Sequence, residues 1–240
     1  MENVSSMRTG YYCQQQQGDN TVTNVFFPSC KAKADYPTSS ARLQEYMAQR
    51  YGVSPIGCCR VHHKNLTQEN TGIVVCNNCA AILEESSQAG HIEFVWNLID
   101  NDASFHFPNY HNEAMTIQDC WVSVEKRALQ DTIRSLLRKM HIHIVELTEN
   151  YDRTRFCGVN LLSKCNPSNA KLAYRRYVAE GSHMFTPCAP DEQVARFRNH
   201  CRQITTERVA CYCKFCTDAI NMGGKTGVHI LELLFPPATD

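Results

Sequence analysis

Short apolar runs that end in closely spaced cysteines decide the fold, first at Ile73-Val74-Val75-Cys76-Asn77-Asn78-Cys79. The pattern returns at Val209-Ala210-Cys211-Tyr212-Cys213-Lys214-Phe215-Cys216. A short run rich in β-branched residues predicts a buried strand, so each Cys-x-x-Cys is expected where a strand ends. In open α/β sheets, ligands bind outside the carboxyl ends of the strands. Both motifs are therefore predicted to face a binding site.

Further cysteines extend the two motifs into two sets with the same order along the chain. In each set a lone cysteine precedes a two-residue site, which precedes the Cys-x-x-Cys. The first set has five thiols and the second has four, because Phe156 stands where the first set has Cys58. The sets are Cys30, Cys58, Cys59, Cys76 and Cys79, followed by Cys120, Cys157, Cys213 and Cys216. Thiol sets of this size suit soft metal ions and iron–sulfur clusters.

Five of the 14 cysteines lie outside this pattern, at positions 13, 165, 188, 201 and 211. On a strand, Cys211 shares a face with Cys213, so it can replace the thiol that is missing at Phe156. The alternative to a metal or cluster is a scatter of buried free thiols. That alternative does not explain why one spacing pattern occurs twice.

The composition favours a globular protein with reduced thiols. Apolar residues make up 43% and charged residues 20% of the chain, so the core does not need disulfides. The formal net charge is zero, which speaks against a nucleic-acid partner. No apolar run reaches the length of a membrane span, and residues 1–20 lack the apolar core of a secretory signal. We therefore expect a cytoplasmic location and a mobile tail over residues 1–23.

Hydrophobic periodicity predicts strands and helices in alternation, which is typical of parallel α/β units. Each cysteine group of the first set is expected where a strand stops. The long connection over residues 163–190 is expected to be irregular, as is the loop over residues 101–112. The predicted strands cover residues 23–30, 73–76, 91–99, 115–120, 142–147 and 209–213, with a closing apolar element at 228–235. The predicted helices cover residues 39–51, 80–88, 124–140 and 191–204.

The cysteines and their neighbours resemble the cysteine-rich CCG domain. This domain occurs twice in the B-type subunit of heterodisulfide reductase and in related iron–sulfur oxidoreductase subunits. The resemblance spans residues 24–235 and implies an α/β fold of two tandem, pseudo-twofold-related CCG domains, each with a small, mostly parallel sheet flanked by helices. The first domain, with a linker, is expected over residues 24–112 and the second over 113–240. The matching stretches are Phe26-Phe27-Pro28-Ser29-Cys30, Gly57-Cys58-Cys59, Gln118-Asp119-Cys120, Phe156-Cys157-Gly158, His229-Ile230-Leu231-Glu232-Leu233 and the two Cys-x-x-Cys motifs.

The resemblance also implies a function. Five-cysteine sites of this family hold non-cubane iron–sulfur clusters at which a disulfide is reduced, and members with fewer cysteines can bind zinc or another cluster. By position, the first set is expected to bind a non-cubane or [4Fe–4S] cluster, and the second set zinc or [4Fe–4S]. Electrons are expected from an iron–sulfur or flavin partner subunit, and the substrate is expected to be a disulfide or thiol.

The chain departs from the family pattern at three points. Arg60 follows Cys59 where the family usually has glycine, and Phe156 replaces a cysteine. Only the short stretch 60–75 separates Cys59 from its Cys-x-x-Cys, whereas residues 158–212 separate the corresponding positions of the second set. The first site is therefore expected to be more open, or to be closed by a partner.

The candidate catalytic residues are Cys58, Cys59, His62 and His63. Histidine titrates near neutral pH, so either histidine can protonate a leaving thiolate. The alternative interpretation is that both are solvated loop histidines. A non-catalytic alternative for the whole chain is a metal-binding protein, with zinc or an iron–sulfur cluster, that transfers electrons or acts as a scaffold in a larger redox complex.

Overall fold

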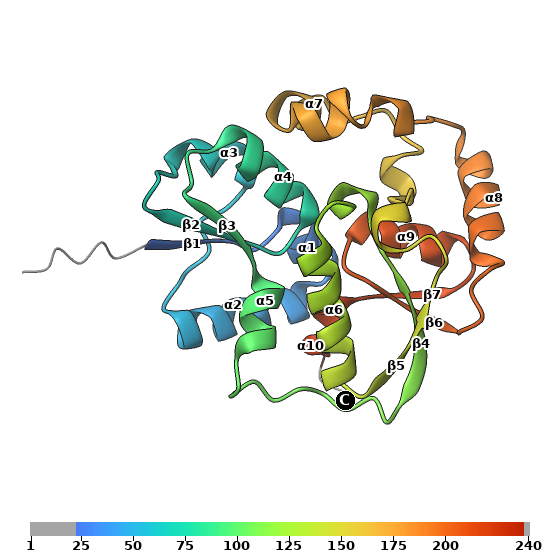
Figure 1. Ribbon diagram of the computed structural model, residues 1–240, viewed down its shortest axis with the longest axis horizontal. Coiled ribbons are helices and arrows are strands. Elements are labelled where there is room, and N and C mark those ends of the chain that lie inside the picture. Colours follow the sequence, from blue (N-terminus) through green and yellow to red (C-terminus); the bar gives the residue numbers. More distant parts are fainter. Residues whose placement is uncertain (1–22, 238–240) are drawn as a thin grey trace, which may run out of the picture.

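The computed structural model describes residues 23–237 and shows a mixed α/β protein with two small parallel sheets flanked by helices (Figure 1). The first sheet has the order β1-β2-β3 and the second β5-β4-β6-β7, and every strand pair is parallel. The strands are β1 Thr23–Phe27, β2 Asn70–Val74, β3 His91–Phe94, β4 Glu113–Gln118, β5 Ile142–Glu146, β6 Arg208–Cys211 and β7 Thr226–His229. The predicted α/β fold with a small parallel sheet in each half is confirmed. The predicted mobile tail lies, apart from Thr23, outside the described residues.

Helices cover both sheets, and several begin directly after a strand or a cysteine. They are α1 Cys30–Asp35, α2 Pro37–Tyr51, α3 Cys59–His62, α4 Asn77–Ser86, α5 Val95–Asn101, α6 Arg127–Lys139, α7 Pro167–Leu172, α8 Pro190–Cys201, α9 Lys214–Met222 and α10 Ile230–Leu234. Single turns are η1 His63–Asn65, η2 Trp121–Ser123, η3 Tyr151–Arg153, η4 Gly158–Asn160, the π-helical η5 Arg175–Ala179 and η6 Ser182–Met184. Across residues 23–237, no helix has the length and apolar character that crossing a bilayer requires.

The two sheets share a strand order. β1, β2 and β3 lie side by side in one sheet, and β4, β6 and β7 do so in the other, while β5 extends the second sheet beyond β4. In each sheet the first two of these strands lead to cysteines, and the third runs directly into a helix, α5 or α10. This shared order is what a tandem repeat would produce. A pseudo-twofold relation between the halves stays a prediction.

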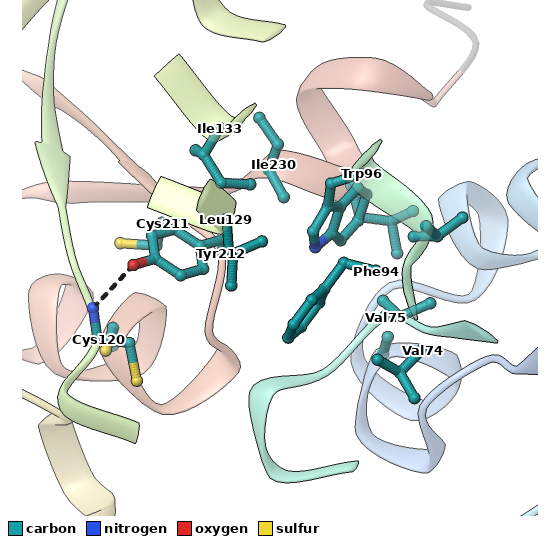
Figure 2. Close-up of a cluster of buried hydrophobic side chains, with 14 of the residues drawn as sticks. Val74, Val75, Phe94, Trp96, Cys120, Leu129, Ile133, Cys211, Tyr212 and Ile230 are labelled. Atoms are coloured by element: carbon teal, nitrogen blue, oxygen red, sulfur yellow. Dashed lines mark hydrogen bonds between the residues drawn. The ribbon is translucent and has the colours of Figure 1, made fainter. Parts of the chain in front are cut away.

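The halves share one hydrophobic core. Figure 2 shows Phe94 and Trp96 of the first half facing Leu129, Ile133 and Ile230 of the second, and all of these side chains are buried. Helix α5 packs against α6, and α10 packs against α2. Burying both sheets against common helices removes apolar surface from water that either half alone would expose.

Some predicted elements differ from the structure. One strand is predicted over residues 91–99, but pairing with β2 ends at Phe94, and Val95 begins α5. Val95, Trp96 and Ile99 are buried on one face of that helix, so a strand and a helix follow each other within one apolar segment. The pair Cys58-Cys59 does not follow a strand, because only a single bridge joins Pro55 to Phe26 there.

The connection over residues 163–190 is not irregular. It contains α7, η5 and η6, and we call residues 166–185 the strap because they cross from the second half over α4 of the first (Figure 1). Ser86 Oγ donates to the Leu172 carbonyl (2.6 Å), and the Arg175 backbone N–H donates to Glu85 (2.7 Å). The strap therefore joins the two halves on the side of the cysteines.

The second half holds the strap by ion pairs and aromatic packing. Glu125 pairs with both Arg175 and Arg176. The Trp121 ring packs edge-on against Tyr177, with the ring centroids 6.3 Å apart. The guanidinium of Arg176 lies 5.7 Å from the Trp121 ring centroid, within cation–π range.

Candidate metal centre

Four cysteines of the second set converge at the carboxyl ends of β4 and β6. The thiol sulfurs of Cys120, Cys157, Cys213 and Cys216 all lie within 4.8 Å of one another. The sulfurs of Cys120 and Cys157 are 3.4 Å apart. Cys120, Cys157 and Cys216 are almost fully buried, and Cys213 is partly buried. Four thiols this close together can hold a metal ion or cluster.

Three of these thiols stand at helix starts. Cys120, Cys157 and Cys213 occupy the positions just before η2, η4 and α9, respectively. The Thr217 N–H in α9 donates to the Cys213 carbonyl (3.0 Å), which closes the first turn. Free N–H groups at a helix start favour negative charge, so this placement stabilises thiolates.

The crowded thiols shift one another's pKa values in opposite directions. Burial alone would raise the pKa of Cys120, but hydrogen bonds with Cys157, Cys213 and Cys216 hold it well below its usual value. The hydrogen bond with Cys120 raises the pKa of Cys157 well above its usual value, and burial does the same for Cys216. One thiolate is thus favoured, and further deprotonation is opposed until a cation neutralises the set.

A buried polar network fixes the backbone beside these ligands. Asp119 and Tyr212 each precede a ligand cysteine, and the Tyr212 hydroxyl donates to Asp119 Oδ1 (2.9 Å). The same hydroxyl accepts from the Cys120 backbone N–H (3.3 Å), the bond drawn dashed in Figure 2. Arg134 pairs with Asp119 (2.8 Å) and with Glu146 (2.6 Å). Burial would lower the pKa of Arg134, but hydrogen bonds to Glu146 and Asp119 raise it. The network therefore ties β4 to β6 and α6 at the thiols.

The second site is closely packed at Gly158, and a cavity of about 170 Å³ is lined in part by Phe156, Cys157 and His200. Gly158 has a left-handed φ of 48°, and a Cβ there would lie 1.9 Å from the Phe215 carbonyl oxygen. Only glycine permits this approach of η4 to the second Cys-x-x-Cys. Phe156 stacks on His200 with the ring centroids 4.1 Å apart, and burial lowers the pKa of His200 to about 4. A neutral aromatic pair therefore occupies the position of the missing cysteine.

The five thiols of the first set form a chain of neighbours and not one compact group. Hydrogen bonds with Cys59 and Cys76 raise the pKa of Cys79 well above its usual value. Burial and a hydrogen bond with Cys58 raise the pKa of Cys30, and the charge of Cys59 adds to this. Within residues 23–237, the second set alone brings three or more Cys, His or carboxylate ligands within 4.8 Å of one another.

The first set is more exposed than the second. Cys30 is exposed and Cys58 is partly buried, whereas Cys59 and Cys79 are buried. Ser29, just before Cys30, is a buried residue at a left-handed φ of 65°, and its Oγ accepts from the Ala32 N–H (3.3 Å). Backbone held in this region costs of order 1–3 kcal/mol and is found mainly at functional sites.

The two candidate histidines have different surroundings. His63 is buried, and its Nδ1 donates to the Cys59 carbonyl (3.1 Å), which gives it a role in holding the turn. The ring of His62 is partly exposed and lies over Gly57, where a Cβ would be 3.1 Å from its Nε2. Of the two histidines, His62 is the more accessible, and its ring lies beside the residue that precedes Cys58. Both lie in short helical turns, α3 and η1, and only His63 is buried.

Inside the first Cys-x-x-Cys, the two asparagines differ. Asn78 accepts from the Tyr177 hydroxyl (2.7 Å), and its amide donates to Asn169 of the strap (3.4 Å). Asn169 also accepts from Arg60 (2.7 Å). Asn77 is only 3% exposed, and neither its Nδ2 nor its Oδ1 has a hydrogen-bond partner among the described residues.

The two thiol sets lie near each other. The pKa of Cys76 is lowered, mainly by a hydrogen bond with Cys79. Burial and the negative charge of Cys213 oppose this shift, which means that Cys213 of the second set lies near enough to act on Cys76. Burial raises the pKa of Tyr177 well above its usual value, and charges on thiols of both sets raise it further. The strap residue Tyr177 therefore lies between the two sets.

The sequence indicated all nine cysteines of the two sets but not the residues that hold them in place. The alternative ligand Cys211 is buried and lies outside the compact group. Asp119 and Tyr212 could have been found as polar residues directly before ligand cysteines. Tyr177 could not, because nothing in its local sequence links it to Asn78.

Comparison of the chain with protein-family models, with curated proteins and with solved structures found no match in any of the three.

Proposed function

We propose that the protein is an iron–sulfur redox subunit of the heterodisulfide-reductase B type, which passes electrons from a partner protein to a disulfide at the first thiol set. The observation that carries this proposal is the unequal exposure of the two sets. Cys30 lies at the surface and Cys58 is partly exposed, whereas three of the four thiols in the second set are almost fully buried. A group that exchanges electrons with a substrate needs access, and a structural metal does not.

The compact second set fits a single ion. With metal–sulfur bonds near 2.3 Å, the ligands of a tetrahedral zinc stand roughly 3.8 Å apart. The 3.4 Å separation of Cys120 and Cys157, and the 4.8 Å limit for the whole set, agree with this spacing. The thiolates of a cubane bind four different irons, so they stand farther apart. We assign zinc in a structural role to this site.

The first set fits a larger group. Its five thiols extend from Cys30 at the surface to the buried Cys79, and five ligands exceed what one zinc ion needs. The unpartnered amide of Asn77, one position after Cys76 and two before Cys79, is a buried polar group that a bound cluster would satisfy if it lay within reach. When bound, an iron–sulfur cluster supplies single-electron transfer.

The chain's own residues would bind the substrate at the surface and move protons. Reducing one disulfide to two thiols takes two electrons, which an iron–sulfur or flavin partner protein supplies, and two protons. Cys30 and Cys58 lie where a disulfide can approach. His62, whose ring lies over Gly57, is the candidate that delivers a proton to a leaving thiolate.

Metal analysis with electron paramagnetic resonance on anaerobically purified protein tests this proposal. We expect about one zinc together with iron and acid-labile sulfide in each chain. Cys79→Ser should lose iron and keep zinc, and Cys216→Ser should lose zinc. Cys188→Ser, outside both sets, should change neither. Zinc without iron or sulfide would sink the redox proposal.

A non-catalytic electron-transfer or scaffold role is the second candidate. No thiol of the first set lines the cavities of about 370 and 170 Å³, whereas Cys157 of the second set lines the smaller one. Neither of these cavities offers a substrate pocket at the first set, which favours a docking partner there. Disulfide reduction with a reduced viologen dye separates the two: turnover that Cys58→Ser abolishes supports the enzyme, and an iron-loaded protein without turnover supports the adaptor.

A further inference from the structure

Asn77, inside the first Cys-x-x-Cys, has a buried side chain without a hydrogen-bond partner among the described residues. Asn77 begins α4 directly after Cys76, and it is only 3% exposed, with both polar atoms of its amide unpartnered among residues 23–237. A buried amide in this state has lost its hydrogen bonds to water without gaining others, which destabilises the fold. Such a residue is expected to meet a partner when the site is filled.

Two comparable residues have polar partners that Asn77 lacks. Asn78, one position further, has its carboxamide bound by Tyr177 and Asn169. In the second Cys-x-x-Cys, the residue in the position of Asn77 is Lys214, which pairs with Asp218 and with Asp35. Asn77 therefore differs from both of these residues in that its side chain lacks a polar partner.

The local geometry limits what the partner can be. Asn77 lies between Cys76 and Cys79 in the first turn of α4, and its amide is unpartnered there. A group held by these thiols presents sulfur, as thiolate or sulfide, to the same turn. The amide has two N–H donors and one carbonyl acceptor, so it can donate to such a sulfur.

We infer that Asn77 hydrogen-bonds the sulfur-rich group bound by the first thiol set, with its Nδ2 donating to a thiolate or sulfide of that group. This inference rests on the proposed function. Asn77 is a positioning residue and not a ligand: it orients the group and stabilises its negative charge. Its Oδ1 then accepts from a donor at the same site, and the thiol product of a disulfide reduction is one.

The test compares Asn77→Leu and Asn78→Leu in the full chain, each with and without metal. Leucine has nearly the shape of asparagine but no polar atoms. In metal-free, reduced protein, Asn77→Leu should melt at or above the wild-type temperature, because it removes an unsatisfied amide. Asn78→Leu should melt lower, because it leaves Tyr177 and Asn169 without their partner.

After anaerobic reconstitution with ferrous iron and sulfide, Asn77→Leu should be less favourable than wild type, in contrast to its effect on the metal-free protein. Its iron should dissociate to a chelator roughly 10- to 100-fold faster than wild-type iron, as for the loss of an outer partner of a metal ligand. The zinc content, held by the second set, should not change. Equal iron release by variant and wild type would overturn the inference, as would a metal-free Asn77→Leu protein that melts lower than wild type.

The two proposals fail separately. A wild-type chain that binds no iron removes both, and metal analysis alone reveals this. A wild-type chain that binds iron but reduces no disulfide removes the proposed activity, while the melting and iron-release comparisons still decide the role of Asn77.

Discussion

Single residues decide how firmly the second thiol set is held, and Arg134 is the clearest case. Its side chain is 1% exposed and pairs with Asp119, which is fully buried and binds Tyr212 beside the ligands. A buried ion pair is weak evidence for stability, because desolvation offsets the attraction. Removing one partner, however, leaves the other charge buried and unpaired. Arg134 is therefore a residue where a single substitution is costly.

We predict that Arg134→Met lowers the free energy of unfolding by about 3–5 kcal/mol, because Asp119 loses its countercharge. Urea denaturation of the metal-free protein measures this directly. Arg127→Met on the same helix is the matched control, since Arg127 is 66% exposed and pairs with Asp131 at the surface. Its free energy of unfolding should stay within about 0.5 kcal/mol of the wild-type value. A loss for Arg134→Met as small as that expected of the control would show that the network contributes little to stability.

At the scale of elements, the strap depends on acidic side chains of both halves. A hydrogen bond from Arg175 lowers the pKa of Glu125 to about 2, against the opposing effect of burial. The folded pKa is below the ordinary value, so the stabilisation is fully present above about pH 4.5 and is lost as the pH falls toward 2. The strap should therefore loosen in acid.

Fluorescence of Trp121 can follow this loosening, because its ring packs against Tyr177 and Phe185 of the strap. In a Trp96→Phe background, the signal of the otherwise unchanged protein should change between about pH 4.5 and 2. Glu125→Gln should show the loosened signal already at pH 7 and respond less to acid. A Glu125→Gln protein with the same acid response as its parent would assign the change to other carboxyl groups.

The sequence predicts an element well where residues within that element determine it. Strands β4, β5 and β6 end within two residues of their predicted ends, because β-branched runs stop there at polar residues or cysteines. The helix α6 is predicted from residue 124, but η2 precedes it and α6 begins at Arg127. The strap is not predicted at all. Its short helices are held by distant partners, such as Glu85 for Arg175, and these leave no periodic signal in the strap itself.

The same limit applies to the site. Spacing alone indicates the two thiol sets, since a Cys-x-x-Cys on one helical turn is a local pattern. The separation into a compact set and an extended set could not be predicted, because it depends on tertiary packing such as that of Gly158 against Phe215. The orphaned state of Asn77 is likewise visible only once its surroundings are folded.

At the scale of the whole molecule, the shared core predicts that metal loss at one site affects the entire chain. A metal bound only by the folded state stabilises it by about 4 kcal/mol when present at a thousand times its dissociation constant. Because one hydrophobic cluster joins both halves, calorimetry should show a single transition whose midpoint falls when a chelator removes the metal.

Two cysteine variants serve as controls for this experiment. Cys216→Ser should melt like the chelated protein even with metal present, since it removes a ligand of the compact set. Cys188→Ser, outside both sets, should respond to the chelator as wild type does. Two separate transitions, of which one is insensitive to metal, would contradict the shared core.

The strap also bears on how the protein is made. Tyr177 reaches back 99 positions to Asn78, and Asn169 reaches back 109 positions to Arg60. A ribosome releases the chain from its N-terminus at about 5–20 residues per second. For several seconds of synthesis, the first half thus exists without the strap that later binds Asn78 and Arg60. Until residue 177 is made, Asn78 and Arg60 lack their partners in the strap, so the first half reaches its final packing only late in synthesis.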